Sequence, residues 1–268
     1  MRPPPPEERG TRGAAAPVLV LAATPMELAP LRAALVGVRA RAGAWDVIEV
    51  GRLGSLRVAL AVTGIGKVNA AAGLLAAASS TAPCAAIFVG VGGAYPGSPL
   101  TNGMVAAASE ELQLDLGLRH GDGTWEGPEA LGFAITPARD GRPERVNLIP
   151  THAGLQAALA EQGLPLVRFA TLDAVTADVG LAASLHSSYA VAVESMEGAA
   201  AAQVADRLGL PFAEVRGVSN RVGERDKDRW ELRGAIHSSC RAVLGLLRGW
   251  HEHPATRALS GSGVPEGA

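Results

Sequence analysis

Cysteine, aromatic residues and long hydrophobic runs are all scarce in this chain of 268 residues. The 2 cysteines, Cys84 in an apolar run and Cys240 in a helical segment, fit neither a disulfide framework nor a metal-binding motif. We expect both to be buried, reduced thiols. The apolar runs are interrupted well short of the roughly 18 residues that a membrane span needs, and the proline-rich start is unlike a signal peptide. The sequence therefore predicts a cytoplasmic protein with no membrane partner.

An excess of charge of either sign is missing as well. The formal net charge is -2, the two signs are mixed along the chain, and aromatic residues make up only 4%. A surface that binds nucleic acid needs clustered basic residues. We therefore expect no nucleic-acid partner. The 6 histidines include no metal-binding pair and none lies in a nucleophile motif, so no metal is expected either.

Short apolar runs bounded by glycine alternate with helix-length segments rich in alanine and leucine, which is typical of a mostly parallel sheet. The expected strands are 17–22, 56–62, 85–91, 104–108, 166–171, 190–193 and 212–218, and the expected helices are 26–36, 67–78, 151–161, 197–208 and 229–250. We predict an α/β fold: a single catalytic domain over residues 16–252 with a central mixed, mostly parallel sheet flanked by helices. Residues 1–15 and 253–268 are rich in Pro, Gly, Ser and charge and are predicted to be disordered.

Polar side chains follow two of the predicted strands at their carboxyl ends. Glu197 comes after one strand, and Arg216 and Asn220 lie at the end of the next. Ligands of open α/β sheets bind beyond such strand ends, so these residues predict a pocket for a polar small molecule. Met196 can pack against a sugar face, and the Glu197 carboxylate can accept hydrogen bonds from vicinal hydroxyls. Glu194 ranks lower because strand alternation points it elsewhere.

Glu27 opens the helix after the first predicted strand, where a carboxylate can activate water as a general base. For Glu27 and Glu197 alike, the alternative is a stabilising interaction with the helix dipole. Glycine-rich turns at 63–69 and 90–93 lack the spacing of phosphate-binding or dinucleotide-binding loops, which leaves a close approach of backbone to ligand or a simple turn. The polar segment 114–131 is long enough to cover the pocket or an oligomer partner.

Five motifs together resemble the nucleoside phosphorylase/nucleosidase superfamily in order and approximate spacing, over about residues 17–250. They are Met26-Glu27, Gly64-Ile65-Gly66-Lys67, Gly92-Gly93, Ser195-Met196-Glu197 and Arg216-Gly217-Val218-Ser219-Asn220. Within that superfamily the chain is most similar to the futalosine hydrolases, nucleosidases of the alternative menaquinone pathway. The segments that carry this similarity are 90–97, 116–123 and 219–226.

The resemblance implies a nucleoside phosphorylase-like fold, a nucleoside substrate, a homo-oligomer, and no cofactor or metal. The implied reaction is hydrolysis of the N-glycosidic bond of futalosine, which releases hypoxanthine and dehypoxanthine futalosine. Glu27 would orient and deprotonate the water, with Arg216 nearby to hold it. Glu197 would bind the ribose hydroxyls, and Met196 would line the sugar face. The backbone of Val91, Gly92 and Gly93 would approach the substrate.

Two positions depart from the pattern of related enzymes. Asn220 stands where adenine-specific nucleosidases have an aspartate, and its amide can donate to N7 or O6 of a 6-oxopurine such as hypoxanthine. Val91 stands where related nucleosidases have a serine, which weakens a phosphate site and favours water. A 6-oxopurine nucleoside phosphorylase and a catalytically inactive nucleoside-binding protein remain as alternatives. Tyr95, Arg119, His120 and Trp125 are candidates for the far end of the substrate by loop position alone.

Overall fold

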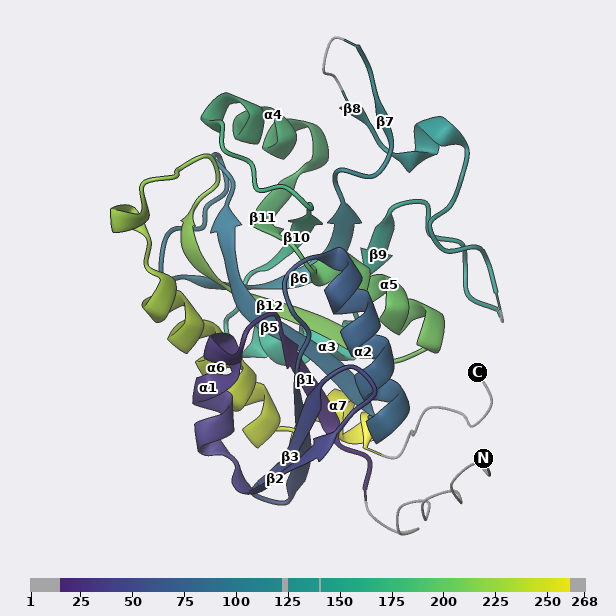
Figure 1. The fold of residues 1–268 in the computed structure, drawn as a ribbon, viewed down its shortest axis with the longest axis vertical. Helices are drawn as coiled ribbons and strands as arrows, with labels where there is room; N and C mark the ends of the chain where they lie inside the picture. Colours follow the sequence, from purple (N-terminus) through teal and green to yellow (C-terminus); the bar gives the residue numbers. More distant parts are fainter. Residues whose placement is uncertain (1–14, 122–124, 140, 261–268) are drawn as a thin grey trace, which may run out of the picture.

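A 10-stranded mixed sheet forms the centre of the computed structural model, which describes residues 15–121, 125–139 and 141–260 (Figure 1). Its strands are β1 (Val18–Ala22), β2 (Val36–Ala42), β3 (Val47–Leu53), β4 (Leu56–Val62), β5 (Ala85–Ala94), β6 (Val105–Gln113), β9 (Leu148–Pro150), β10 (Leu166–Thr171), β11 (Val191–Ser195) and β12 (Phe212–Arg221). A separate hairpin consists of β7 (Leu118–Arg119) and β8 (Trp125–Glu126).

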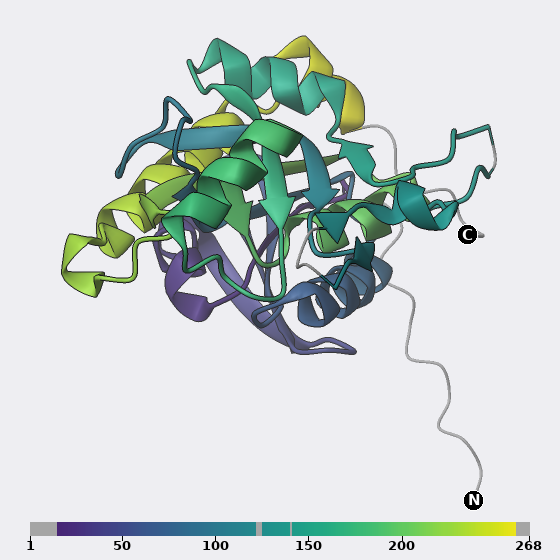
Figure 2. The ribbon, with the colours of Figure 1, turned by 90° about the horizontal axis from the view of Figure 1, so that it is seen from above.

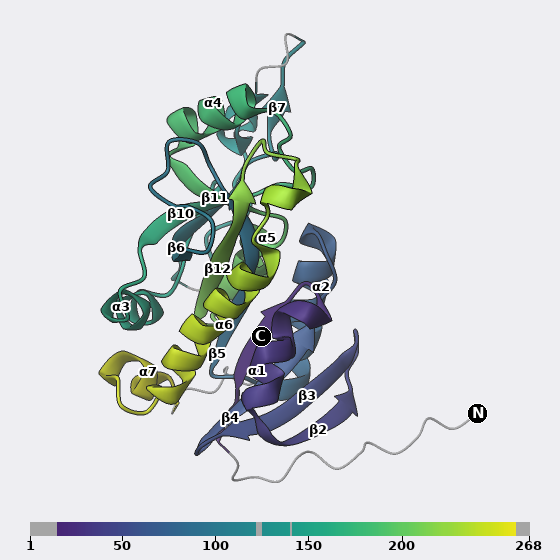
Figure 3. The same cartoon turned by 90° about the vertical axis from the view of Figure 1, so that its left-hand side faces the viewer.

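Helices cover both faces of the sheet, as the views in Figures 2 and 3 show. They are α1 (Pro25–Ala34), α2 (Lys67–Thr81), α3 (Ala153–Glu161), α4 (Val179–Tyr189), α5 (Gly198–Leu208), α6 (Leu232–Arg248) and α7 (Pro254–Leu259), with 3-10 turns η1 (Pro128–Leu131) and η2 (Lys227–Arg229). Among the described residues, no helix combines the length and apolar character needed to cross a membrane.

The strands are ordered β11-β10-β6-β12-β5-β1-β4-β3-β2, and β9 pairs with β6. Strand β1 is parallel to β4 and β5, β12 is parallel to β5, and β10 is parallel to β6 and β11. One end of the sheet closes on itself, because β11 also pairs antiparallel with the end of β5. The predicted α/β fold with a mixed sheet and flanking helices is confirmed.

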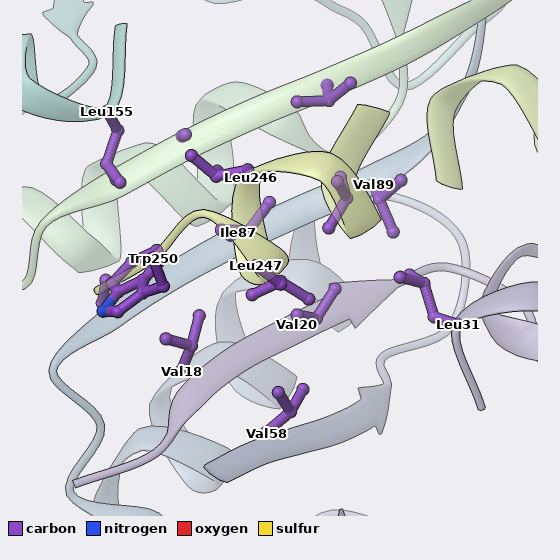
Figure 4. Close-up of a cluster of buried hydrophobic side chains, with 14 of the residues drawn as sticks. Val18, Val20, Leu31, Val58, Ile87, Val89, Leu155, Leu246, Leu247 and Trp250 are labelled. Atoms are coloured by element: carbon purple, nitrogen blue, oxygen red, sulfur yellow. The ribbon is translucent and has the colours of Figure 1, made fainter. Parts of the chain in front are cut away.

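The central strands are apolar along their whole length because both faces are buried. In β1, Val18 and Val20 join a cluster with residues of α1 and α6, whereas Leu19 and Leu21 join a cluster with residues of α2 and α5. Figure 4 shows the first cluster, including Trp250. A strand with two buried faces reads as a continuous apolar run, which is why these strands were recognisable in the sequence.

Helix α6 buries an apolar stripe at helical spacing. Ile236, Cys240, Val243 and Leu247 are buried, and Leu244 packs half-buried against the same cluster. Cys240 is a free, buried thiol, as is Cys84. The predictions for this helix and for both cysteines are confirmed.

Two helical predictions need correction. Helix α1 ends at Ala34 rather than at residue 36, and the chain turns back as the antiparallel pair β2–β3 at the edge of the sheet. Strand β2 is largely exposed, so no apolar run marked it. Helix α4 was also missed, because Ala182 is its one buried residue and no apolar stripe runs along it.

The predicted disordered tail is wrong for residues 254–259, which form α7. Thr256 and Leu259 are buried there, and the Thr256 hydroxyl donates to the Trp250 carbonyl at 2.6 Å. A short segment with a single leucine pointing inward carries too little apolar pattern to be recognised. The other predicted disordered residues, 1–14 and 261–268, lie outside the described residues.

Candidate active site

A cavity of about 320 Å³ opens where the carboxyl ends of β1, β5, β11 and β12 meet the first turns of α1 and α6. Its lining includes every residue that the sequence predicted for the site: Glu27, Val91, Gly92, Gly93, Met196, Glu197, Arg216 and Asn220. Residues from distant parts of the chain thus come together at one edge of the sheet, as ligand sites of α/β folds do. Their chemical roles stay predictions.

Glu27 is fixed in the cavity by three hydrogen bonds. Its Oε2 accepts from the backbone N–H of Thr24 at 3.0 Å and from the Thr24 hydroxyl at 2.8 Å, which forms the capping box of α1. Its Oε1 accepts from the backbone N–H of Val91 at 3.1 Å. The carboxylate is buried and held between a helix start and a strand end. One residue therefore both caps α1 and lines the cavity.

Glu197 connects the glycine-rich turn after β4 to the end of β12. Its Oε1 accepts from the backbone N–H of Gly66 at 3.0 Å, and its Oε2 accepts from Arg216 Nη2 at 3.1 Å. Gly66 has φ of +93°, a conformation that favours glycine and that turns its N–H toward the carboxylate. Met196, beside Glu197, also lines the cavity.

Arg216 is 2% exposed and binds three groups. Nε donates to Glu214 at 2.5 Å, Nη2 donates to Glu197, and Nη1 donates to the Val91 carbonyl at 3.0 Å. Burial by itself lowers the pKa of this guanidinium, but Glu214, Glu197 and Glu27 raise it above its ordinary value. The arginine therefore stays charged. Its ion pairs are with Glu214 and Glu197. It also lies near Glu27, since a Cβ at Gly90 would be 2.5 Å from Glu27 Oε1 and 2.7 Å from Arg216 Nη1, and its predicted role beside Glu27 stays a prediction.

Ser219 and Asn220 reach the cavity through an irregularity in β12. Val218 pairs with Gly92 and Asn220 pairs with Gly93, so Ser219 is an extra residue in the ladder. Asn220 Nδ2 donates to the Arg221 carbonyl at 2.9 Å, and its Oδ1 accepts from the Ser219 hydroxyl at 2.8 Å. A carbonyl oxygen is an acceptor and can face only the NH₂ end of the amide, so this bond fixes the orientation of the Asn220 side chain and leaves one N–H of Nδ2 for a ligand.

Gly92 and Gly93 belong to a strand and not to a turn, which corrects the prediction for residues 90–93. A Cβ at Gly92 would lie 2.7 Å from Val193 Cγ1 and 2.8 Å from the Glu194 carbonyl, and one at Gly93 would lie 2.9 Å from Val222 Cγ2. Strand β11 crosses β5 at this point, so only glycine leaves enough room. The glycines predicted a close approach of the backbone to a ligand or a simple turn. In the structure, the neighbouring strand β11 approaches the backbone closely at the cavity wall.

Glu194 lines the same cavity, although the sequence analysis ranked it below Glu197. Its carboxylate accepts from the Tyr95 hydroxyl at 2.8 Å, from the Thr176 backbone N–H at 2.9 Å and from the Thr176 hydroxyl at 2.7 Å. These bonds join β11 to the segment before α4. Tyr95 is fully buried, and it does not line the cavity.

Four further lining residues were not predicted for the site, although one of them, Arg225, lies in the segment 219–226 that carries the similarity. Thr24 and Thr176 are placed by the hydrogen bonds already described, and Arg225 and Trp230 come from the segment between β12 and α6. The Arg225 guanidinium lies 5.2 Å from the centroid of the Trp230 ring, within the range of a cation–π contact. Only the three-dimensional course of the chain brings these residues to the pocket.

The structure describes residues 114–121 and 125–131 of the long polar segment, and none of these residues lines the cavity. Its first residues are held to the glycine-rich turn, since Lys67 Nζ lies 2.5 Å from Asp115 Oδ1 and 3.1 Å from Asp173 Oδ2. Farther along, His120 pairs with Glu126 across the β7–β8 hairpin at 2.5 Å. The candidates from this hairpin for the far end of the substrate therefore do not contact the cavity in a single copy of the chain.

In the part of the chain that the structure describes, no group of three or more His, Cys, Asp or Glu side chains is arranged to hold a metal ion. The groups that line the cavity include three fixed carboxylates, Glu27, Glu194 and Glu197, the buried guanidinium of Arg216, and the amide of Asn220. Such a site can stabilise a cationic transition state and can orient a nucleophile.

Known proteins match this chain along most of its length. Residues 17–248 match the phosphorylase superfamily. The futalosine hydrolase of Thermus thermophilus is 38% identical over 69% of this chain and 79% of that protein. The 5'-methylthioadenosine/S-adenosylhomocysteine nucleosidase of Mycobacterium bovis is 29% identical over 85% of this chain and 95% of that protein. The solved structure of such a nucleosidase from Colwellia psychrerythraea, in complex with adenine, has a TM-score of 0.73 at 23% identity over 87% of this chain and 95% of that chain.

Proposed function

The chain belongs to the phosphorylase superfamily, and we propose that within its nucleosidases this enzyme hydrolyses futalosine to hypoxanthine and dehypoxanthine futalosine. The observation that carries the proposal is the neutral, oriented amide of Asn220 in the cavity wall. The 38% identity to a futalosine hydrolase supports it independently. The product would serve the alternative menaquinone pathway.

Hydrolysis of an N-glycosidic bond builds positive charge on the ribose while the base leaves with negative charge. Glu197 is positioned to accept from the ribose hydroxyls, and its bonds to Gly66 and Arg216 keep the carboxylate facing the cavity. Glu27 retains free lone pairs beyond its three hydrogen bonds, with which it can accept a proton from water. Met196 would cover the sugar face. These roles need no cofactor.

Water is favoured over phosphate as the nucleophile by the contacts of Glu27. The backbone N–H of Val91 donates to the Glu27 carboxylate, so this donor is not free for a phosphate oxygen. A phosphate dianion would also be repelled by the fixed carboxylates of Glu27 and Glu197. This geometry supports hydrolysis over the phosphorolysis that was kept as an alternative.

A 6-oxopurine fits the hydrogen-bonding capacity of Asn220. With one amide hydrogen on the Arg221 carbonyl, the second can donate to N7 or O6 of hypoxanthine. An aspartate here would place a carboxylate oxygen against that carbonyl, and both groups are acceptors. The amide therefore supports hypoxanthine, and hence futalosine, over an adenine nucleoside.

The outer lining also supports an anionic aromatic group at the far end of the ribose. Arg225 stacks on Trp230 and both residues line the cavity. The carboxyphenyl ketone of futalosine offers a carboxylate for the guanidinium and a ring for the indole. A methylthio group would use neither interaction.

The test is product analysis after incubation with futalosine, methylthioadenosine and inosine, each with and without phosphate. We expect hypoxanthine from futalosine without phosphate. Release that requires phosphate would assign a phosphorylase, and adenine from methylthioadenosine would contradict the role given to Asn220. If no substrate turns over, the binding of futalosine should be measured. Equal affinity of the wild type and of Glu27→Gln for futalosine would then identify a nucleoside-binding protein.

A substitution at Asn220 tests base selection directly. Asn220→Asp should slow futalosine hydrolysis about 5- to 150-fold, corresponding to about 1–3 kcal/mol for an unpaired buried polar group. It should also raise adenine release relative to hypoxanthine release. Asn102→Asp is the matched control. Asn102 Nδ2 also donates to a backbone carbonyl, that of Arg229 at 3.0 Å, but Asn102 does not line the cavity. An unchanged ratio of the two bases in Asn220→Asp would refute the assignment.

The homo-oligomer expected from the resemblance stays a prediction. The start of α2 and the turn before it expose Ile65, Val68 and Leu75 by 58%, 79% and 48%. Association through this surface would remove these side chains from water. Sedimentation equilibrium of the wild type and of Val68→Glu would measure it.

A further inference from the structure

Behind Arg216, away from the cavity, two carboxyl groups lie buried against each other. Glu111 on β6 and Glu214 on β12 are both 0% exposed. Both lie close to Gly198 at the start of α5: a Cβ there would collide with Glu214 Oε2 and would lie 2.8 Å from Glu111 Oε2. Neither residue lines the cavity, so the role of this pair is separate from substrate contact.

Three of the four oxygens of this pair have no hydrogen-bond partner when both carboxyls are taken as ionised. These atoms are Glu111 Oε1, Glu111 Oε2 and Glu214 Oε2, whereas Glu214 Oε1 accepts from Arg216. Buried polar atoms are rarely left unpaired, and two adjacent carboxylates cannot both stay charged in a dry interior. A proton on one of the two would supply the missing donor and remove the repulsion.

The residues that the adjacent strands and α5 place next to Glu111 have no side chain that could donate a hydrogen bond to it. Strand pairing places Phe169 of β10 and Ile149 of β9 beside it, and α5 places Gly198 opposite it. Among the described residues, the titratable groups that act on Glu111 are Glu214 and Arg216. Burial and then Glu214 raise the pKa of Glu111 well above its ordinary value, while Arg216 opposes the shift.

We propose that Glu111 and Glu214 hold one proton between them, and that this proton makes Glu111 a positioning residue for Arg216. With one proton, the pair carries a single negative charge, which balances the guanidinium. Arg216 can then also bind Glu197 and the Val91 carbonyl. Glu197 and Glu27, the other carboxylates that act on Arg216, line the cavity.

Loss of the shared proton would change where Arg216 is held. A second negative charge on the pair would draw the guanidinium toward β6 and weaken its bond to Glu197. The contribution of Arg216 to activity should therefore be intact at pH values below the raised pKa of Glu111 and should decline as the pH rises through it. The inference requires only nucleosidase activity and does not depend on futalosine being the substrate.

Glu111→Gln tests this directly, because the glutamine amide donates permanently to Glu214 Oε2 and cannot lose that hydrogen at high pH. We expect kcat at neutral pH to stay within about threefold of wild type, and the alkaline decline of kcat to disappear or to move to higher pH. Glu110→Gln is the matched control on the same strand, since Glu110 pairs with Arg168 instead. It should keep the wild-type profile. The substrate is whichever of futalosine, methylthioadenosine and inosine the wild type hydrolyses fastest.

Infrared spectroscopy of the wild type and of Glu111→Gln gives a second measurement that does not depend on turnover. A shared proton produces the carbonyl stretch of a buried carboxylic acid at neutral pH, and the band should vanish in Glu111→Gln. The absence of that band in wild type would overturn the proposal. An alkaline limb in Glu111→Gln identical to that of wild type would overturn the positioning role.

Discussion

Replacing Glu27 by glutamine removes the predicted base and keeps its shape. The carboxylate accepts from three donors, two on Thr24 and the backbone N–H of Val91. Glutamine has one oxygen, so its NH₂ group must face either the Val91 N–H or the Thr24 N–H. One backbone donor is thereby left unpaired, at a cost of about 1–3 kcal/mol. For a domain of this size the melting temperature should fall by about 2–12 °C.

The effect of Glu27→Gln on turnover should be much larger than its effect on folding. A positioned general base contributes about 10²- to 10⁴-fold, and an amide cannot accept the proton. A domain with about 5–15 kcal/mol of stability remains folded after losing up to about 3. Initial rates of base release, measured beside thermal unfolding of the same samples, separate the two effects.

Glu49→Gln provides the matched control. Glu49 lies on β3 and pairs with Arg32, whose Nε donates to both carboxylate oxygens at 2.8 Å, outside the cavity. The loss of such a partly exposed pair costs about 0–1 kcal/mol and should leave kcat unchanged. If Glu27→Gln kept its rate within tenfold of wild type, water activation by Glu27 would be refuted. A similar loss in both variants would indicate a general effect on folding.

Two further substitutions follow from the packing. Gly90→Ala would place a methyl group 2.5 Å from Glu27 Oε1 and 2.7 Å from Arg216 Nη1, and displacement of these groups should lower kcat about 10²-fold, measurable by initial rates. Trp250→Ala should cost about 3–5 kcal/mol in urea unfolding with little change in kcat, since Trp250 is fully buried in the core and does not line the cavity. A fully active Gly90→Ala or an unchanged unfolding midpoint in Trp250→Ala would contradict these assignments.

The parts of the fold that could be predicted are those where burial dictates composition. Strands β1 and β5 are buried on both faces, so their apolar runs are easy to find, although β5 extends past the predicted residue 91 to Ala94. Glu27 and Glu197 come directly after such strands, and for that reason sequence alone could bring them to one edge of the sheet. The positions of the site residues follow from the same pattern.

The contacts between those residues could not be predicted. The pairing of Arg216 with Glu214 agrees with their i, i+2 spacing on one face of β12, but its pairing with Glu197 depends on where β12 lies relative to α5, and no spacing in the sequence encodes that. Strand β11 crosses β5 at Gly92, so a glycine-rich stretch that suggests a turn is part of a strand. Helix α7 was missed because two inward side chains are too few to form a pattern.

The extra residue in β12 also bears on how base preference can evolve. Asn220 follows Ser219, which has no partner of its own on β5, and the strand pairing on either side involves backbone atoms only. A new side chain at 220 therefore leaves the ladder intact. If Asn220 selects the base as proposed, a duplicated gene could acquire a different purine preference in a single mutational step that keeps the fold, since asparagine and aspartate codons differ by one nucleotide.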